Sequence, residues 1–204
     1  MHDPMYHDGA RRLQDRFDTR RLADRLVEVV THGTFTDAER AFIESRPLFF
    51  LATADADGHP DCSYKGGRPG FVRVIDPRTL AFPSYDGNGM FKSLGNILVN
   101  PHVGMLFIDF ERPRRLRVNG RATVCDDDPL LADFVGAQLI VRVEAHAIFP
   151  NCPRYVHTMQ VLEPSPHAPC EGHTPPIPDW KRRPEFREVL PAGDPAATPP
   201  ADQG

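Results

Sequence analysis

Apolar and polar positions divide the chain into helical and extended stretches. Between residues 13 and 30, apolar residues recur at helical spacing with charges between them, which predicts an amphipathic helix. Thr36-Asp37-Ala38-Glu39 has the spacing of a capping box and predicts a second, short helix. Pro47 follows the expected end of that helix. We therefore expect residues 1–46 to form a helical cover over the region that follows.

From residue 48 onward the pattern is that of β-strands. Two runs joined by the turn Asp57-Gly58 predict a hairpin. Helical spacing returns between residues 87 and 100, and Pro101 ends that predicted helix. We expect a mainly β, α+β fold in which six antiparallel strands form a small barrel with one inserted helix and flanking helices. Further β patterns lie at 71–75, 79–83, 102–110, 114–125 and 138–150, and the turn Asp76-Pro77-Arg78 joins the first two into a second hairpin.

The end of the chain has a different composition. Beyond Glu163 the sequence is rich in proline and contains the single tryptophan, Trp180. We therefore expect a β domain over residues 47–163 and a C-terminal extension over 164–204. From about residue 191 the extension lacks large apolar residues, which predicts disorder at its end.

Charge and composition exclude several classes of protein. The net charge of −4 gives no general attraction to nucleic acid or to anionic membranes. No apolar run approaches the ~20 residues that a transmembrane helix needs, and the N-terminus lacks the apolar core of a signal peptide. We expect a cytoplasmic protein that binds neither nucleic acid nor membranes.

The cysteines and histidines do not predict a metal site. No two cysteines form a CxxC pair, so free thiols are expected in a reducing cytosol. His157, His167 and His173 lie near Cys170, but their spacing fits no compact zinc pattern. We expect no bound metal and read these residues as parts of a solvated loop. The four cysteines are Cys62, Cys125, Cys152 and Cys170.

One segment has the composition of a phosphate cradle. Ser84 and Asn88 precede Lys92 and Ser93, which fall in the first turn of the helix predicted between 87 and 100. A helix N-terminus offers free N–H groups and a partial positive charge, and a lysine and a hydroxyl strengthen both. The alternative is that Asn88 only caps the helix and Lys92 is solvated.

Arginines form two further local clusters. Arg68 and Arg73 lie in the apolar RPGFVRV segment, and Arg114, Arg115 and Arg117 precede VNG. Local positive charge in an acidic chain favours one anionic ligand over nucleic acid, because these residues alternate with strand positions instead of forming an exposed stripe. The alternative is that they form ordinary surface ion pairs.

An ordered series of motifs resembles the pyridoxamine-5′-phosphate-oxidase-like FMN-binding family. The resemblance spans about residues 48–125, and FPNCPRYVH at 149–157 is similar to one uncharacterised branch of the family. It implies a split barrel and a homodimer with two FMN sites at its interface. The motifs are LATAD (51–55), RPGFVRV (68–74), SLGNI (93–97), NPHVGMLF (100–107) and RVNG (117–120).

The resemblance also implies a set of cofactor-binding residues. The strand 71–74 would lie along the isoalloxazine ring, and Lys92 and Ser93 would bind the FMN phosphate where the family commonly has Arg-Lys. Ser84 and Asn88 would lie near the ribityl-phosphate arm, and Arg117 or a neighbour would approach from the RVNG strand. The implied residues are Arg68, Phe71, Val72, Arg73, Val74, Ser84, Asn88, Lys92, Ser93 and Arg117.

The chain departs from true pyridoxamine-phosphate oxidases near its C-terminus. Their Arg-x-His substrate motif is absent, and the nearest match, Arg154-Tyr155-Val156-His157, has the wrong spacing. The resemblance therefore supports FMN binding but not vitamin B6 oxidation. Cys152 is either a redox thiol near the flavin or a small buried residue, and no catalytic residue is assigned.

Three functions remain open from the sequence. The first is an FMN-dependent oxidoreductase acting on an unknown small molecule, with hydride from NAD(P)H or another small donor. The second is a non-catalytic FMN-binding or storage protein, and the third is a haem-handling split-barrel protein. No GxGxxG motif precedes a helix, so a nicotinamide would bind only transiently.

Overall fold

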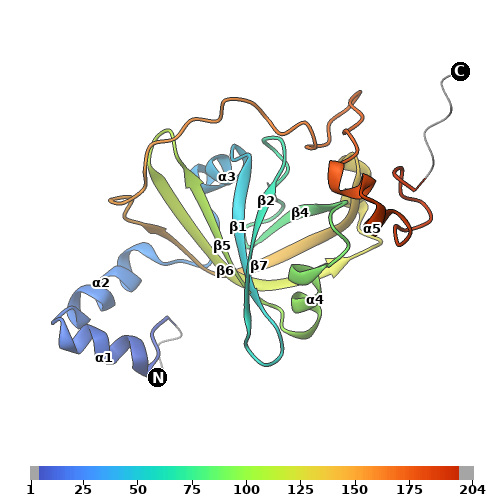
Figure 1. Ribbon diagram of the computed structural model, residues 1–204. Helices are drawn as coiled ribbons and strands as arrows, with labels where there is room; N and C mark the ends of the chain where they lie inside the picture. The colour runs from blue at the N-terminus through green and yellow to red at the C-terminus, as the bar shows by residue number, and fades with distance from the viewer. Residues whose placement is uncertain (1–4, 198–204) are drawn as a thin grey trace, which may run out of the picture.

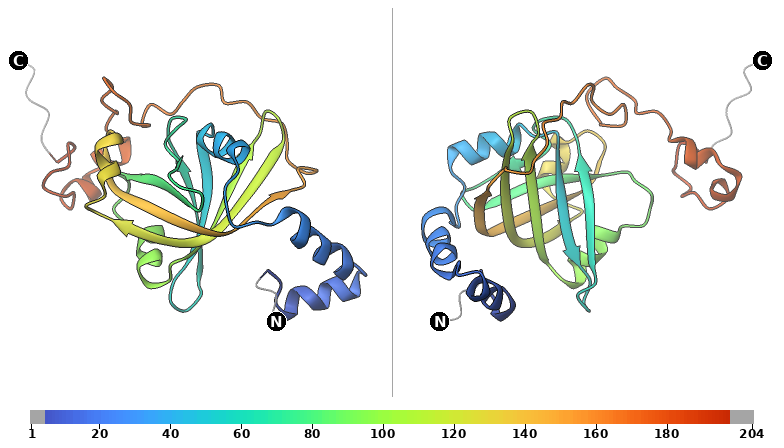
Figure 2. Two further views of the ribbon diagram at one scale, coloured as in Figure 1. Left: turned by 180° about the vertical axis from the view of Figure 1, so that it is seen from behind. Right: turned by 60° about the vertical axis from the view of Figure 1, so that its left-hand side comes forward.

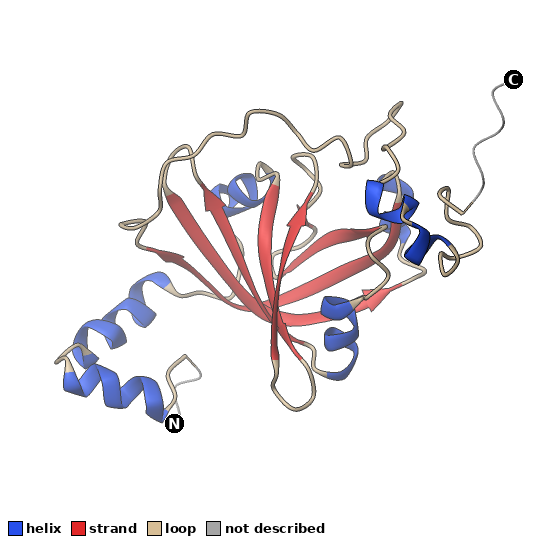
Figure 3. Cartoon of the chain, viewed as in Figure 1, coloured by secondary structure: helices blue, strands red, loops and turns tan. Residues whose placement is uncertain are grey.

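A computed structural model describes residues 5–197, and its centre is one antiparallel sheet with helices around it (Figure 1). The strand order is β2-β1-β5-β6-β7-β4-β3. Strands on the two sides of the sheet run at steep angles to one another, so that the sheet curves around its core (Figure 3). The strands are β1 (Leu48–Ala54), β2 (Pro60–Gly66), β3 (Arg73–Val74), β4 (Thr79–Tyr85), β5 (His102–Asp109), β6 (Arg114–Cys125) and β7 (Ala137–Asn151).

The expectation of a six-stranded barrel is wrong in its strand number. The sheet has seven strands, and β3, with only two residues, is paired to β4 at one end of the order. β2 stands at the other end, and within residues 5–197 no ladder joins β2 to β3. The seven strands therefore form an antiparallel sheet with β2 and β3 at its two edges.

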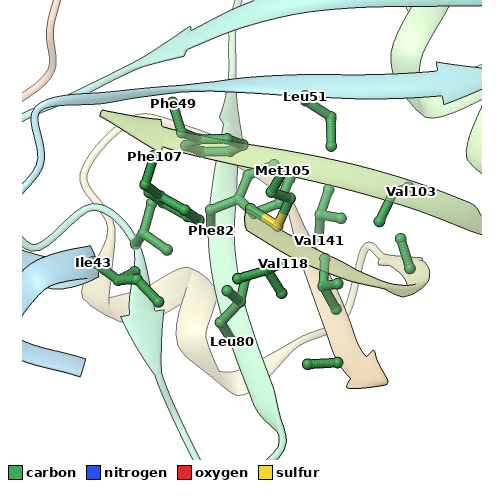
Figure 4. Packing of buried hydrophobic residues seen from close by; sticks show 14 of the residues in the cluster. Ile43, Phe49, Leu51, Leu80, Phe82, Val103, Met105, Phe107, Val118 and Val141 are labelled. Atoms are coloured by element: carbon green, nitrogen blue, oxygen red, sulfur yellow. The ribbon is translucent and has the colours of Figure 1, made fainter. Parts of the chain in front are cut away.

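Alternation along the strands builds the core. Phe49 and Leu51 of β1 are fully buried, whereas Phe50 between them is only half-buried, as expected where successive side chains point to opposite faces. The Phe49 ring lies 5.0 Å from the ring of Phe82 and 5.2 Å from that of Phe107, measured between centroids (Figure 4). These rings tie β1, β4 and β5 together on the inner face of the sheet.

The N-terminal segment forms three helices, not the expected two. The helix predicted over 13–30 is broken because Asp18 has a left-handed φ of 52°, which a short polar side chain tolerates. The helices are α1 (Asp8–Arg16), α2 (Arg20–Val30) and α3 (Asp37–Glu44).

Of these three N-terminal helices, only α3 packs closely on the sheet. Its predicted capping box is present between Thr36 and Glu39, and its Phe42 and Ile43 are buried in the core. α1 and α2 stand beside the sheet (Figure 2), and the described part of these two helices buries only Ala23. The cover expected from residues 1–46 is thus supplied by α3.

The C-terminal extension crosses the rim of the sheet and ends in two short helices, η2 (Asp179–Arg182) and α5 (Pro184–Arg187) (Figure 1). Lys181 is buried, and its Nζ lies 2.7 Å from Asp86 and 2.6 Å from Asp194. Asp194 belongs to the stretch from about residue 191 for which the sequence predicts disorder, and residues 198–204 of that stretch lie outside the described part. None of the helices within 5–197 is long and apolar enough to cross a bilayer.

Candidate functional site

Polar side chains from three elements meet where β2 approaches α4 (Lys92–Val99). Lys65 is paired with Phe49 and Asp61 with Thr53, so both polar side chains lie on the inner face of the sheet. α4 covers this end of the face, where Asn96 Nδ2 donates to Thr53 Oγ1 at 3.0 Å. A groove of about 420 Å³ opens here, which we call the polar groove. Its lining includes Lys65, Ser84, Asn88, Lys92 and Ser93.

The N-terminus of α4 has no side-chain cap. Its N-cap residue, Phe91, has a left-handed φ of 48° and makes no capping hydrogen bond. Asn88 Oδ1 instead accepts a hydrogen bond from the backbone N–H of Met90 at 3.0 Å. The reading of Asn88 as a helix cap is therefore wrong. Lys92 is the first residue of the helix, beside N–H groups of the kind that bind anions.

The charges in the polar groove are unequal. Lys65 and Lys92 bring two positive charges, and Asp61 brings one negative charge. Asp61 Oδ2 accepts a hydrogen bond from Ser93 Oγ at 3.3 Å. Burial lowers the pKa of Lys65, and the nearby Asp61 carboxylate partly opposes this effect. An anion in the groove would favour the protonated form of Lys65.

The remaining implied site residues lie elsewhere. Arg73 forms an ion pair with Asp133 at 2.7 Å and lies 4.3 Å from the centre of the Phe134 ring. Arg117 is exposed on β6, away from the three cavities described in this section. The side chains of Phe71, Val72 and Val74 are buried in the core, and Phe71 also lines a cleft next to the polar groove.

The loop before β3 is held by close backbone contacts. Gly67 N–H donates to the Pro47 carbonyl at 2.9 Å, and Gly70 N–H donates to the Glu44 carbonyl at 2.7 Å. A Cβ atom at Gly67 would lie 2.5 Å from the Phe71 side chain, so only glycine fits without displacing that ring. The loop therefore has a defined position beside β2.

Two further cavities continue from the polar groove. A cleft of about 240 Å³ shares Lys65, Ser84 and Tyr85 with the groove. It also shares Tyr64, Gly66 and Tyr85 with a third cavity of about 580 Å³, which we call the apolar pocket. Arg68 lines this third cavity. The apolar pocket includes Leu48, Tyr64, Tyr85, Ile108, Met159 and Val161.

Sequence reasoning missed three residues of this surface. Lys65, Asp61 and Tyr85 were not assigned to the site, although the structure places each in the polar groove. Tyr85 lines all three cavities, and burial raises its pKa. The signal that places Lys65 here is its pairing with Phe49, which cannot be read from β2 alone.

Other candidate groups lie apart from the groove. Cys152 is exposed and lines none of the three cavities. The described residues contain one cluster with metal-ligand geometry, formed by Asp55, Asp57 and His59 at the tip of the β1–β2 hairpin. The cluster does not include His157, His167 or His173.

Comparison with protein families gives one match. A family model described as pyridoxamine 5′-phosphate oxidase matches residues 35–167, which is more than half of the chain. The matched range contains β1 to β7 and the polar groove. No curated protein matches the chain.

Several solved structures resemble parts of the chain. A Lactobacillus delbrueckii protein, a candidate pyridoxamine 5′-phosphate oxidase, is 25% identical, with 58% of this chain and 95% of that chain covered and a TM-score of 0.47. An FMN-binding protein from Syntrophomonas wolfei is 11% identical, with coverages of 69% and 97% and a TM-score of 0.44. The haem storage protein HutZ from Vibrio cholerae is 18% identical, with coverages of 53% and 89% and a TM-score of 0.41. These scores are too low to transfer a ligand from one protein to another.

Proposed function

The chain belongs to the pyridoxamine 5′-phosphate oxidase family, and from this premise we propose that it is an FMN-binding flavoprotein that acts as an oxidoreductase on a small molecule. The observation that carries the proposal is the polar groove. Lys92, Ser93 and Lys65 converge there beside an uncapped helix N-terminus, which is the environment that a phosphate monoester requires.

Different residues of the groove would contact different parts of the cofactor. Lys65, Lys92 and Ser93 would hold the phosphate, while Ser84 and Asn88 would lie near the ribityl chain. The ring would extend toward Tyr85 and the neighbouring cleft. The flavin, when bound, supplies hydride transfer. Tyr85 keeps its phenolic proton at neutral pH, because burial raises its pKa, and so remains a hydrogen-bond donor.

A split-barrel homodimer with FMN at its interface belongs to the same proposal. The inner face of β1 and β5 is filled by core residues, so a tricyclic ring has no room inside the sheet. Phe50 and Leu106 face the opposite side and are paired neighbours in the ladder, only half-buried. A second copy placed on this face by two-fold symmetry would create two equivalent sites.

Cofactor titration tests the proposal. Equilibrium dialysis should give about one FMN per chain and weaker binding of riboflavin, which lacks the phosphate. Lys92→Ala should weaken FMN binding by roughly ten- to a hundred-fold, the cost of a charge-assisted hydrogen bond. Arg112→Ala, at an exposed turn, is the matched control. Equal affinity for FMN and riboflavin would remove the phosphate contact from the proposal.

Spectra and turnover separate the remaining functions. An absorbance spectrum distinguishes bound flavin from bound haem directly. A flavin spectrum with anaerobic reduction by NADH, NADPH or another small donor supports an oxidoreductase. Flavin that binds stoichiometrically but is reduced by none of these donors supports an FMN-binding or storage protein instead.

A further inference from the structure

The apolar pocket is large enough for a second ligand beside the polar groove. Its volume of about 580 Å³ falls within the range typical of small-molecule sites, about 300–1,000 Å³. Half-buried Leu48 and Ile108 line it from the sheet. Met159 and Val161 line it from the segment after β7, and each keeps 52% of its surface exposed.

This second wall is held against the sheet. Met159 N–H donates to the Phe110 carbonyl at 3.1 Å, just beyond the end of β5. Further along, Ala168 is buried and its N–H donates to the Ser165 carbonyl at 3.0 Å. The backbone of Met159 is thus held at the end of β5, and Val161 follows two residues later in the same segment.

The charges around the pocket favour some ligands over others. Arg46 and Asp109 form an ion pair at 2.8 Å, and Asp86 is paired with Lys181 at 2.7 Å. The lining charges left outside these two ion pairs are Arg68, Glu111 and Glu163. Their sum is one net negative charge when His167 is neutral. The charged residues of the lining are Arg46, Arg68, Asp86, Asp109, Glu111 and Glu163.

We propose that the apolar pocket is the substrate site and that it binds a small, largely apolar molecule without negative charge. This inference rests on the proposed flavin site, to which the pocket is joined through the cleft lined by Tyr64, Gly66 and Tyr85. A phosphate ester does not fit, because Arg46 is already neutralised and the glutamates outnumber Arg68. The site therefore differs in charge from the polar groove beside it.

Two probes with one skeleton and opposite charges test this charge preference. 2-Naphthylmethylamine is a cation and 2-naphthoate an anion at neutral pH, and calorimetric titration into the FMN-loaded full chain measures both. We expect one amine per chain, bound about fivefold more tightly than the carboxylate, the upper range for a partly exposed charge. Glu163→Gln removes one negative charge from the lining and should bring the affinities for the amine and the carboxylate closer together. Equal or tighter binding of 2-naphthoate would overturn the proposal.

A pair of variants tests the location of the site. Val161→Lys places a cation in the wall and should weaken amine binding at least fivefold. Leu162→Lys adds the same charge one residue away, at a side chain that is 91% exposed and outside the pocket lining, and should leave binding unchanged. Equal loss in both variants would show a general charge effect and contradict a site in this pocket.

Two further results would assign the pocket to another occupant. One-for-one displacement of the amine by FMN would make the pocket part of the flavin site. Loss of amine binding as the protein concentration rises would show that a second copy covers it. Either result overturns the inference. The flavin proposal has its own readout, because FMN dialysis on the unmodified chain does not involve the naphthyl probes.

Discussion

Lys65 carries a charge in a place where burial opposes it. It is half-buried on the inner face of an edge strand, opposite the core residue Phe49, and burial lowers its pKa. Asp61, four residues earlier on the same face, provides only partial compensation. A bound phosphate would provide a stronger partner, so ligand binding and protonation of Lys65 are linked.

This linkage predicts how FMN affinity depends on pH. The pKa of Lys65 in the free protein is below the ordinary lysine value, and a bound phosphate would raise it. FMN affinity should therefore be full below the lowered pKa and fall as the pH rises through it, whereas riboflavin affinity should stay level. Dialysis from neutral to alkaline pH measures both. Lys65→Arg should remove the decline, because arginine stays charged; an identical decline for riboflavin would place the effect elsewhere.

Asp61 gives a prediction of opposite sign. Its carboxylate accepts a hydrogen bond from Ser93 Oγ and lines the polar groove, where it would repel a phosphate. Asp61→Asn should tighten FMN binding by about fivefold, which corresponds to about 1 kcal/mol for one partly solvated charge. Asp57→Asn, at the exposed tip of the same hairpin, is the control. Unchanged or weaker FMN binding in Asp61→Asn would move the phosphate away from this residue.

At the scale of elements, long regular patterns were predictable and short irregular ones were not. The strands expected at 114–125 and 138–150 match β6 and β7 closely, because twelve or more alternating positions define them. The β segment predicted over 71–75 contains only the two residues of β3, because the preceding loop is held by the distant carbonyls of Glu44 and Pro47. Local periodicity contains no information about such contacts.

The same limit applies to the candidate site. Lys92 and Ser93 were predictable because a helix start can be read from neighbouring residues. Lys65 was not, since its face depends on the register between β1 and β2. Arg117 was expected near the site from the family resemblance, and alternation along β6 leaves its side chain exposed.

The C-terminal extension contains an ion-pair cluster, Lys181 with Asp86 and Asp194, that should stabilise it. Among residues 5–197, Asp194→Ala leaves Lys181 with the exposed Asp86 as its only ion-pair partner, so the free energy of unfolding should fall by about 1–3 kcal/mol. Denaturant unfolding and limited proteolysis after residue 178 measure the change. Glu188→Ala, at an exposed position nearby, should have little effect. Equal stability of the two variants would show that the cluster contributes nothing.

At the scale of the molecule, the outer face of β1 and β5 predicts association. Leu106→Arg, next to Phe50 in the ladder, should shift the protein from dimer to monomer and release flavin in parallel. Sedimentation at falling concentrations, with flavin fluorescence followed in the same samples, measures both. Val189→Arg, at a tail residue that is 76% exposed, should change neither. A monomer that retains its flavin would contradict a site built from two chains.

Asp86 connects two parts of the molecule that are distant in sequence. It borders the cleft and the apolar pocket, and it also holds Lys181 of the extension at 2.7 Å. Coupling between two equilibria is reciprocal. If ordering of the extension raises the affinity for a ligand by some factor, binding of that ligand raises the equilibrium constant for ordering the extension by the same factor. The degree of order of the extension would therefore report whether a ligand occupies the cleft or the apolar pocket. The slowing of hydrogen exchange around Lys181 on addition of a compound would measure that coupling without any assay of turnover.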